Sequence, residues 1–227
     1  MGKTIDKIKN IKIVKTLSNI GKIEDLRQRI LVTLMLVAVY RFGSYVVLPG
    51  IDTEALTGVQ NQTSTGLMSL LDMFSGGAFS KASIFALGIM PYISASIVMQ
   101  LLGIAVPYFQ KMQREGESGR RKMNQYTSYL TLFILLLQAP SYLLTLKWQN
   151  GGLNPMHESL DWTWFVVSST IILTAGSMFV LWLGERITDK GIGNGISLII
   201  MIGIIARFPQ AFIQEFTTRF TTPGQGG

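Results

Sequence analysis

The chain has 227 residues, of which 48% are hydrophobic and only 15% are charged, and its mean hydropathy is +0.36. A soluble domain usually carries about 25% charged residues, so this composition indicates a membrane protein with several spans. The sequence contains no cysteine, which excludes disulfides and cysteine-ligated metals, and its single histidine cannot form a two-histidine zinc motif.

The basic residues lie in clusters between the apolar runs, and the formal net charge is +7. This distribution favours membrane anchoring over nucleic-acid binding. If the N-terminus is cytoplasmic, 15 of the 20 lysines and arginines fall on the inner side and 5 on the outer side. Cytoplasmic segments carry an excess of lysine and arginine, so the pattern predicts a multi-pass protein with its N-terminus inside.

The first 29 residues form a basic segment in which isoleucines recur about every three residues between 4 and 20. This spacing predicts a helix that lies on the membrane surface. A disordered basic tail is the alternative. The first transmembrane helix is predicted over 30–48.

Residues 66–79, "GLMSLLDMFSGGAF", are apolar but too few to cross a bilayer. One interpretation is a re-entrant helix that enters the protein from outside, which is tolerated where protein or water surrounds it. The other is a helix lying on the outer leaflet. Gly76 and Gly77 would supply a hinge, since glycine adopts backbone conformations that other residues avoid.

The second transmembrane helix is predicted over 80–102, with a kink at Pro91 because proline interrupts helical hydrogen bonding. The following cytoplasmic loop, 103–122, is predicted to be flexible at its glycines Gly116 and Gly119. It carries a cationic group that either anchors the loop on the inner side or binds an acidic partner. The residues of this group are Arg114, Arg120, Arg121 and Lys122.

Two long charge-free runs predict the third and fourth transmembrane helices, over 123–146 and 162–183. A cytoplasmic loop is expected over 184–193. Asn194 is expected to cap the fifth transmembrane helix, predicted over 194–213, and residues 214–227 are expected to begin an external loop.

Two pairs of isoleucines are spaced four residues apart, so each pair shares one helix face. They are Ile89 with Ile93, and Ile196 with Ile200. Ordinary packing or lipid contact explains such pairs. A hydrophobic constriction, which closes a pore by resisting wetting, is the sharper hypothesis.

Four blocks carry a family resemblance: "YRFGSYVVLPGID" (40–52), "DMFSGGAFSKASIFALGIMPYISASI" (72–97), "EGESGRRKMNQYT" (115–127) and "WLGERITDKGIGNGISLII" (182–200). The chain resembles the SecY family, the channel subunits of the bacterial Sec translocon, from about Leu26 to Pro209. The resemblance implies an all-α polytopic membrane protein of ten helices in two pseudo-symmetric halves. This sequence would supply the first half, with five transmembrane helices and a re-entrant plug helix, and would end in the external loop before helix six.

The resemblance also implies roles for the residues. The four isoleucines would form part of a pore ring, and the span at 80–102 would line a lateral gate through which signal sequences leave. Segment 66–79 would be the plug. Its residues are Leu67, Leu70, Leu71, Met73, Phe74, Ser75, Gly76 and Gly77.

The partners implied by the resemblance are the SecE and SecG subunits, the motor ATPase SecA, the translating ribosome, a membrane insertase, signal sequences and nascent polypeptides. SecA would meet the basic loop. No nucleic acid is expected to bind directly, except ribosomal RNA through the second half. The expected location is the bacterial inner membrane.

A transporter of small solutes and an intramembrane enzyme are the competing functions. Transporters normally place ionisable groups near the membrane midplane, and the centres of these spans carry none. The sequence also lacks GxSxG, HExxH and P-loop motifs. We therefore expect no catalytic residues, metal or cofactor, and expect a partner to supply the energy for transport.

Overall fold

The computed structural model describes residues 23–51, 67–149 and 161–221. The surface segment predicted at 4–20 lies outside these residues. The described part of the chain is mostly helical, and an isolated bridge of extended backbone joins Val47 to Ser83. The helices are α3 (Glu24–Gly43), α5 (Leu67–Phe74), α6 (Met90–Ala105), α7 (Pro107–Arg114), α8 (Glu117–Gln149), α9 (Trp162–Lys190) and α10 (Gly195–Thr221).

Local sequence explains where two of the long helices begin. The Asp161 side chain accepts a hydrogen bond from the Thr163 N–H at 3.4 Å, which caps α9. The Asn194 Oδ1 accepts from the N–H groups of Ile196 and Ser197 at 3.1 and 3.2 Å. The predicted cap of the fifth span is therefore confirmed.

The predicted second span is only partly helical. Residues 75–89 form a series of turns, and α6 begins at Met90 rather than Ser80. Pro91 lies in the first turn of α6, where its missing N–H breaks no helical hydrogen bond. The predicted kink at Pro91 is therefore wrong.

The predicted loop over 103–122 contains helix instead. Val106 is extended, as expected before Pro107, and the chain bends there by 99° between α6 and α7. A Cβ on Gly119 would lie 1.7 Å from the Met112 carbonyl oxygen, so α7 packs directly on the backbone of α8. Gly119 thus serves close packing, and the flexibility predicted for it was wrong.

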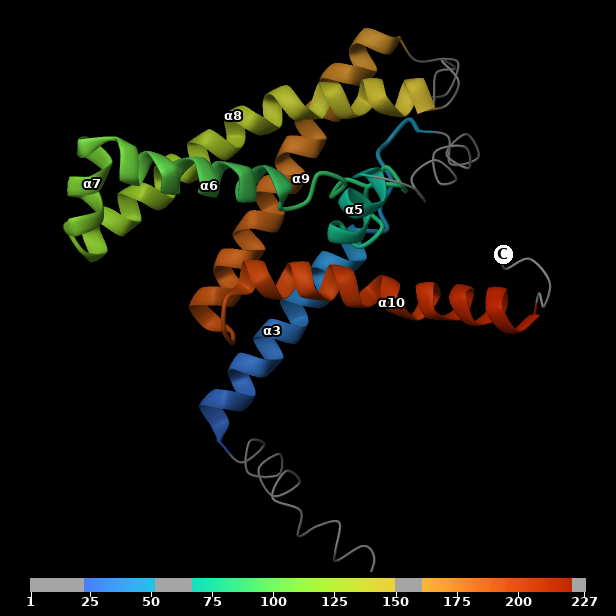
Figure 1. The fold of residues 1–227 in the computed structure, drawn as a ribbon, viewed down its shortest axis with the longest axis horizontal. Helices are drawn as coiled ribbons and strands as arrows, with labels where there is room; N and C mark the ends of the chain where they lie inside the picture. Colours follow the sequence, from blue (N-terminus) through green and yellow to red (C-terminus); the bar gives the residue numbers. More distant parts are fainter. Residues whose placement is uncertain (1–22, 52–66, 150–160, 222–227) are drawn as a thin grey trace, which may run out of the picture.

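Helix α9 is the central helix of the packing, because it contacts α3, α8 and α10. Helix α6 packs along α8, and the short α5 contacts α10 (Figure 1). Figure 1 also shows the C-terminal half of α10 extending beyond the other helices. Residues of the turns at 75–89 take part in both buried clusters of the fold.

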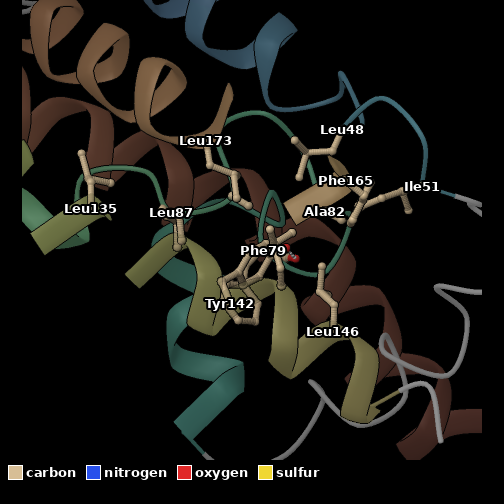
Figure 2. Close-up of a cluster of buried hydrophobic side chains, with 13 residues drawn as sticks. Leu48, Ile51, Phe79, Ala82, Leu87, Leu135, Tyr142, Leu146, Phe165 and Leu173 are labelled. Atoms are coloured by element: carbon tan, nitrogen blue, oxygen red, sulfur yellow. Dashed lines mark hydrogen bonds between the residues drawn. The ribbon is translucent and has the colours of Figure 1, made fainter. Parts of the chain in front are cut away.

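Two buried hydrophobic clusters form the core. The first joins the turns at 75–89 to α8 and α9, and Figure 2 shows Phe79 and Tyr142 lying against each other within it. Their ring centroids are 4.8 Å apart, and the Tyr142 hydroxyl donates to the Phe79 carbonyl oxygen at 2.7 Å. The second cluster joins α3, α9 and α10 around Tyr40, Phe85 and Ile199.

Within the described ranges, α8 and α9 are long and apolar enough to cross a membrane, and α6 with α7 adds a third span if the bent pair is counted as one. Residues Gly195–Pro209 of α10 form a shorter apolar helix. Large apolar side chains are exposed along these helices, among them Leu137, Ile171 and Phe208. An all-helical membrane protein is confirmed, and the arrangement in five spans stays a prediction.

Candidate functional site

The four isoleucines of the predicted ring come together in the second buried cluster. Ile89 is 6% exposed, and Ile93, Ile196 and Ile200 are half-buried and pack against the same cluster. Ile89 and Ile93 lie at the beginning of α6, and Ile196 and Ile200 lie in the first two turns of α10. Two helix beginnings, distant in sequence, thus place branched aliphatic side chains side by side.

The predicted plug segment consists of α5 and the turns that follow it. Leu70, Met73 and Phe74 are exposed, whereas Leu71 packs against the first buried cluster and Ser75 is buried. The Leu67 side chain lies outside the described residues. Helix α5 therefore exposes three apolar side chains and turns Leu71 and Asp72 toward the rest of the fold.

Gly76 and Gly77 occupy backbone conformations that favour glycine, with φ angles of +66° and +88°. The Gly77 N–H donates to the Asp72 carbonyl oxygen at 2.9 Å, which closes the turn after α5. Both glycines thus use the backbone freedom that the sequence analysis expected of them. The action of Gly76 and Gly77 as a hinge stays a prediction.

Serine side chains and an aspartate satisfy the buried backbone of this turn. The Asp72 Oδ1 accepts from the Ser80 N–H at 2.8 Å. The Ser75 hydroxyl donates to the Asp72 carbonyl oxygen at 3.1 Å and accepts from the Phe79 N–H at 3.0 Å. Buried turns need such partners because an unpaired backbone group is costly away from water.

Helix α5 is held on two sides. Asp72 forms an ion pair with Arg207 of α10. On α3, the Tyr40 hydroxyl donates to the Ser75 carbonyl oxygen at 3.4 Å, and the Arg41 Nη1 donates to the Gly76 carbonyl oxygen at 3.5 Å.

Asp72, Arg41 and Arg207 were not among the residues that the sequence singled out for a functional role. An acidic residue in an apolar stub and an arginine that closes an apolar run are each costly near a membrane. That shared cost was the signal that could have linked Asp72 to Arg207. Which of the arginines pairs with Asp72 depends on the tertiary structure.

The predicted docking residues gather at the turn between α7 and α8. Arg114 ends α7, and Arg120, Arg121 and Lys122 lie in the first turns of α8, all exposed. Arg121 forms an exposed ion pair with Glu117, with 2.9 Å between Nη2 and Oε1. A surface hollow of about 470 Å³ lies beside this pair, lined by Glu117, Ser118, Arg121, Lys122 and Gln125.

Comparison with known proteins identifies one family. The family model described as SecY matches residues 83–225. The protein translocase subunit SecY of Buchnera aphidicola subsp. Acyrthosiphon pisum (strain APS) is 45% identical over 89% of this chain and 45% of its own length. The protein of the same name from Escherichia coli (strain K12) is 45% identical over 84% of this chain and 43% of its own length. The protein translocase subunit SecY of Aquifex aeolicus (strain VF5) is 43% identical over 86% of this chain and 46% of its own length.

The fold and the site define a helical membrane protein in which a short, partly buried helix lies beside an aliphatic cluster built from two helix beginnings. The chain belongs to the SecY family. It spans a little under half the length of the relatives named above.

Proposed function

We propose that this chain forms the first half of the central pore-forming subunit of a bacterial Sec translocon. That subunit conducts unfolded secretory proteins across the inner membrane and releases transmembrane segments sideways into lipid. The observation that carries the proposal is the convergence of Ile89, Ile93, Ile196 and Ile200 beside the short helix α5. The names of the relatives, protein translocase subunits, support the same role.

An aliphatic ring suits the passage of many different polypeptides. Strong polar contacts would retain the cargo, whereas conduction requires binding weak enough to let it leave. The same apolar surface resists wetting when it is closed, which limits ion flow. In this proposal the half-buried side chains of Ile93, Ile196 and Ile200 line the constriction, and the second half of the subunit completes it.

Helix α5 acts as the plug in this proposal, and α6 acts as a helix of the lateral gate. Plug movement would pivot at Gly76 and Gly77. The support for the plug role is that α5 rests on α10 just beyond the isoleucines and contacts the fold through few polar groups. A segment that must move is expected to have limited contact with its surroundings.

The proposed partners follow from the same assignment: SecE, SecG, SecA, a translating ribosome, a membrane insertase, and signal sequences with their nascent chains. The exposed basic turn between α7 and α8 would receive SecA, because its guanidinium groups complement an acidic surface. The N-terminus would be cytoplasmic and the protein would span the inner membrane several times. Energy for transport would come from the partner.

Photo-crosslinking of an arrested secretory precursor tests the proposed pore. A photoreactive residue placed at each of the four isoleucine positions of the full-length protein, in its complex, is expected to capture the precursor midway. Ile171 is the matched control, because it is 63% exposed on the outward face of α9. Crosslinks at Ile171 but at none of the four isoleucines would contradict the proposal.

A further inference from the structure

The most deeply buried charge in the described part of the chain belongs to α5. The Asp72 side chain is 2% exposed, and its Oδ2 pairs with the Arg207 guanidinium, whose side chain is 36% exposed. The other carboxylate oxygen accepts from the Ser80 N–H at 2.8 Å. Both oxygens of this carboxylate therefore have partners, one on α10 and one in the turns directly after the plug segment.

Arg207 lies on the same face of α10 as the predicted ring. Ile196, Ile200, Gly203 and Arg207 follow each other at intervals of four, three and four residues, which forms one stripe along a helix. Gly203 lies against the plug, because a Cβ there would meet the Phe74 carbonyl oxygen at 2.9 Å. The stripe thus leads from the isoleucines directly to the seat of α5.

The remaining polar contacts that hold α5 to other helices are weaker. The bonds from Tyr40 and Arg41 to backbone carbonyl oxygens are 3.4 and 3.5 Å long. Hydrogen bonds weaken at such distances. Between Asp72 and Arg207 both groups are charged, and one is enclosed, so solvent screens this pair less than a surface pair.

We propose that the Asp72–Arg207 ion pair holds the plug in its seat and sets the threshold for its release. This rests on the proposed function of α5 as a plug. The pair exists only in the seated state, so it stabilises that state relative to the released one. Asp72 and Arg207 are positioning residues: they act on the position of the plug and do not line the ring.

A single cysteine at Ser75 reports the position of the plug. Ser75 is 4% exposed, and the 227-residue sequence contains no cysteine, so Ser75→Cys introduces one thiol that is hidden while α5 is seated. The full-length protein carrying this change, with any other cysteines removed, is reconstituted with its partner subunits in liposomes. The rate of labelling by a membrane-impermeant maleimide is then measured without substrate.

Three variants separate the effect of the ion pair from that of the hydrogen bond between the Ser80 N–H and Asp72. Asp72→Asn keeps an oxygen for the Ser80 N–H and removes the charge. Arg207→Gln removes the opposite charge, and the third variant combines both changes. Each single change is expected to raise the labelling rate about tenfold. The double variant is expected to show about the same increase as a single one, because both changes remove the same interaction.

The controls are Asp25→Asn and Arg29→Gln, which break an exposed ion pair of 3.2 Å on α3 and should leave labelling unchanged. Wild-type labelling rates in both single variants would overturn the proposal. So would a double variant whose effect is the product of the two single effects. Labelling needs no precursor, so it can fail or succeed independently of crosslinking at the isoleucines, which tests the proposed function.

Discussion

At the scale of single residues, Gly203 permits a close approach between the backbones of α5 and α10. A Cβ at this position would lie 2.9 Å from the Phe74 carbonyl oxygen and 3.4 Å from the Gly76 nitrogen. Both atoms belong to the backbone, so they cannot yield as a flexible side chain would. The contact therefore depends on the absence of a side chain at Gly203.

Gly203→Val is expected to separate α5 from α10. The added carbons overlap backbone, and such overpacking lowers the free energy of unfolding by about 1–3 kcal/mol. The measurements are thermal unfolding in detergent and maleimide labelling of Ser75→Cys, which should speed up. Ile205→Phe adds volume at a position of α10 that is 57% exposed and serves as the control. If the Gly203→Val variant unfolded at the same temperature and were labelled at the same rate as the protein with Gly203, the packing argument would be contradicted.

Tyr142 is a second residue whose role only the structure defines. Its hydroxyl lies at the Phe79 carbonyl oxygen, which also accepts from the Ala82 N–H at 3.2 Å. Tyr142→Phe leaves that carbonyl one partner, so we expect a loss of about 1 kcal/mol in unfolding free energy. The measurement is unfolding in detergent, with the exposed Tyr129→Phe as control. Tyr142→Ala removes the ring as well as the hydroxyl and should lower the unfolding free energy further. Equal losses in the phenylalanine and alanine variants would contradict this, because the hydroxyl would then account for the whole effect.

At the scale of elements, the segment 75–89 shows where sequence patterns are ambiguous. Residues 80–89 belong to a run that the sequence predicts to be the beginning of a span, yet the chain folds them into turns. Turns are tolerated here because protein covers the backbone, and side chains such as Ser75 and Asp72 supply hydrogen bonds. Hydropathy reports that a segment is removed from water, but it does not distinguish lipid from the protein interior.

The first turn of α10 depends on the cap at Asn194. Asn194→Ala removes the acceptor for the N–H groups of Ile196 and Ser197 and should destabilise the helix by about 1 kcal/mol. Amide hydrogen exchange at these two residues is expected to become faster. Asn194→Asp retains an acceptor oxygen and should preserve the protection. Unchanged exchange in the alanine variant would contradict the role of the cap.

At the scale of the whole molecule, the charge asymmetry predicts the orientation of α8. Arg120, Arg121 and Lys122 lie near its beginning, and Lys147 lies near its end. Because basic residues gather on the cytoplasmic side, the beginning of α8 should be inside.

Cysteine labelling in right-side-out and inverted vesicles tests this orientation. Ser118→Cys and Trp148→Cys occupy exposed positions at opposite ends of α8. An impermeant maleimide is expected to label Trp148→Cys from outside and Ser118→Cys from the cytoplasmic side. Labelling of both from one side would mean that α8 does not cross the bilayer.

The sequence alone determined the helical membrane class, the family and the Asn194 cap, because composition, continuous motif blocks and capping depend on residues near each other in the chain. It also singled out the isoleucine pairs, through the regular spacing of helix faces. Only the tertiary structure decided that the two pairs meet, that 75–89 forms turns, and that Asp72 pairs with Arg207. These outcomes depend on contacts between residues far apart in the chain, and many pairings of the same apolar segments satisfy the sequence pattern equally well.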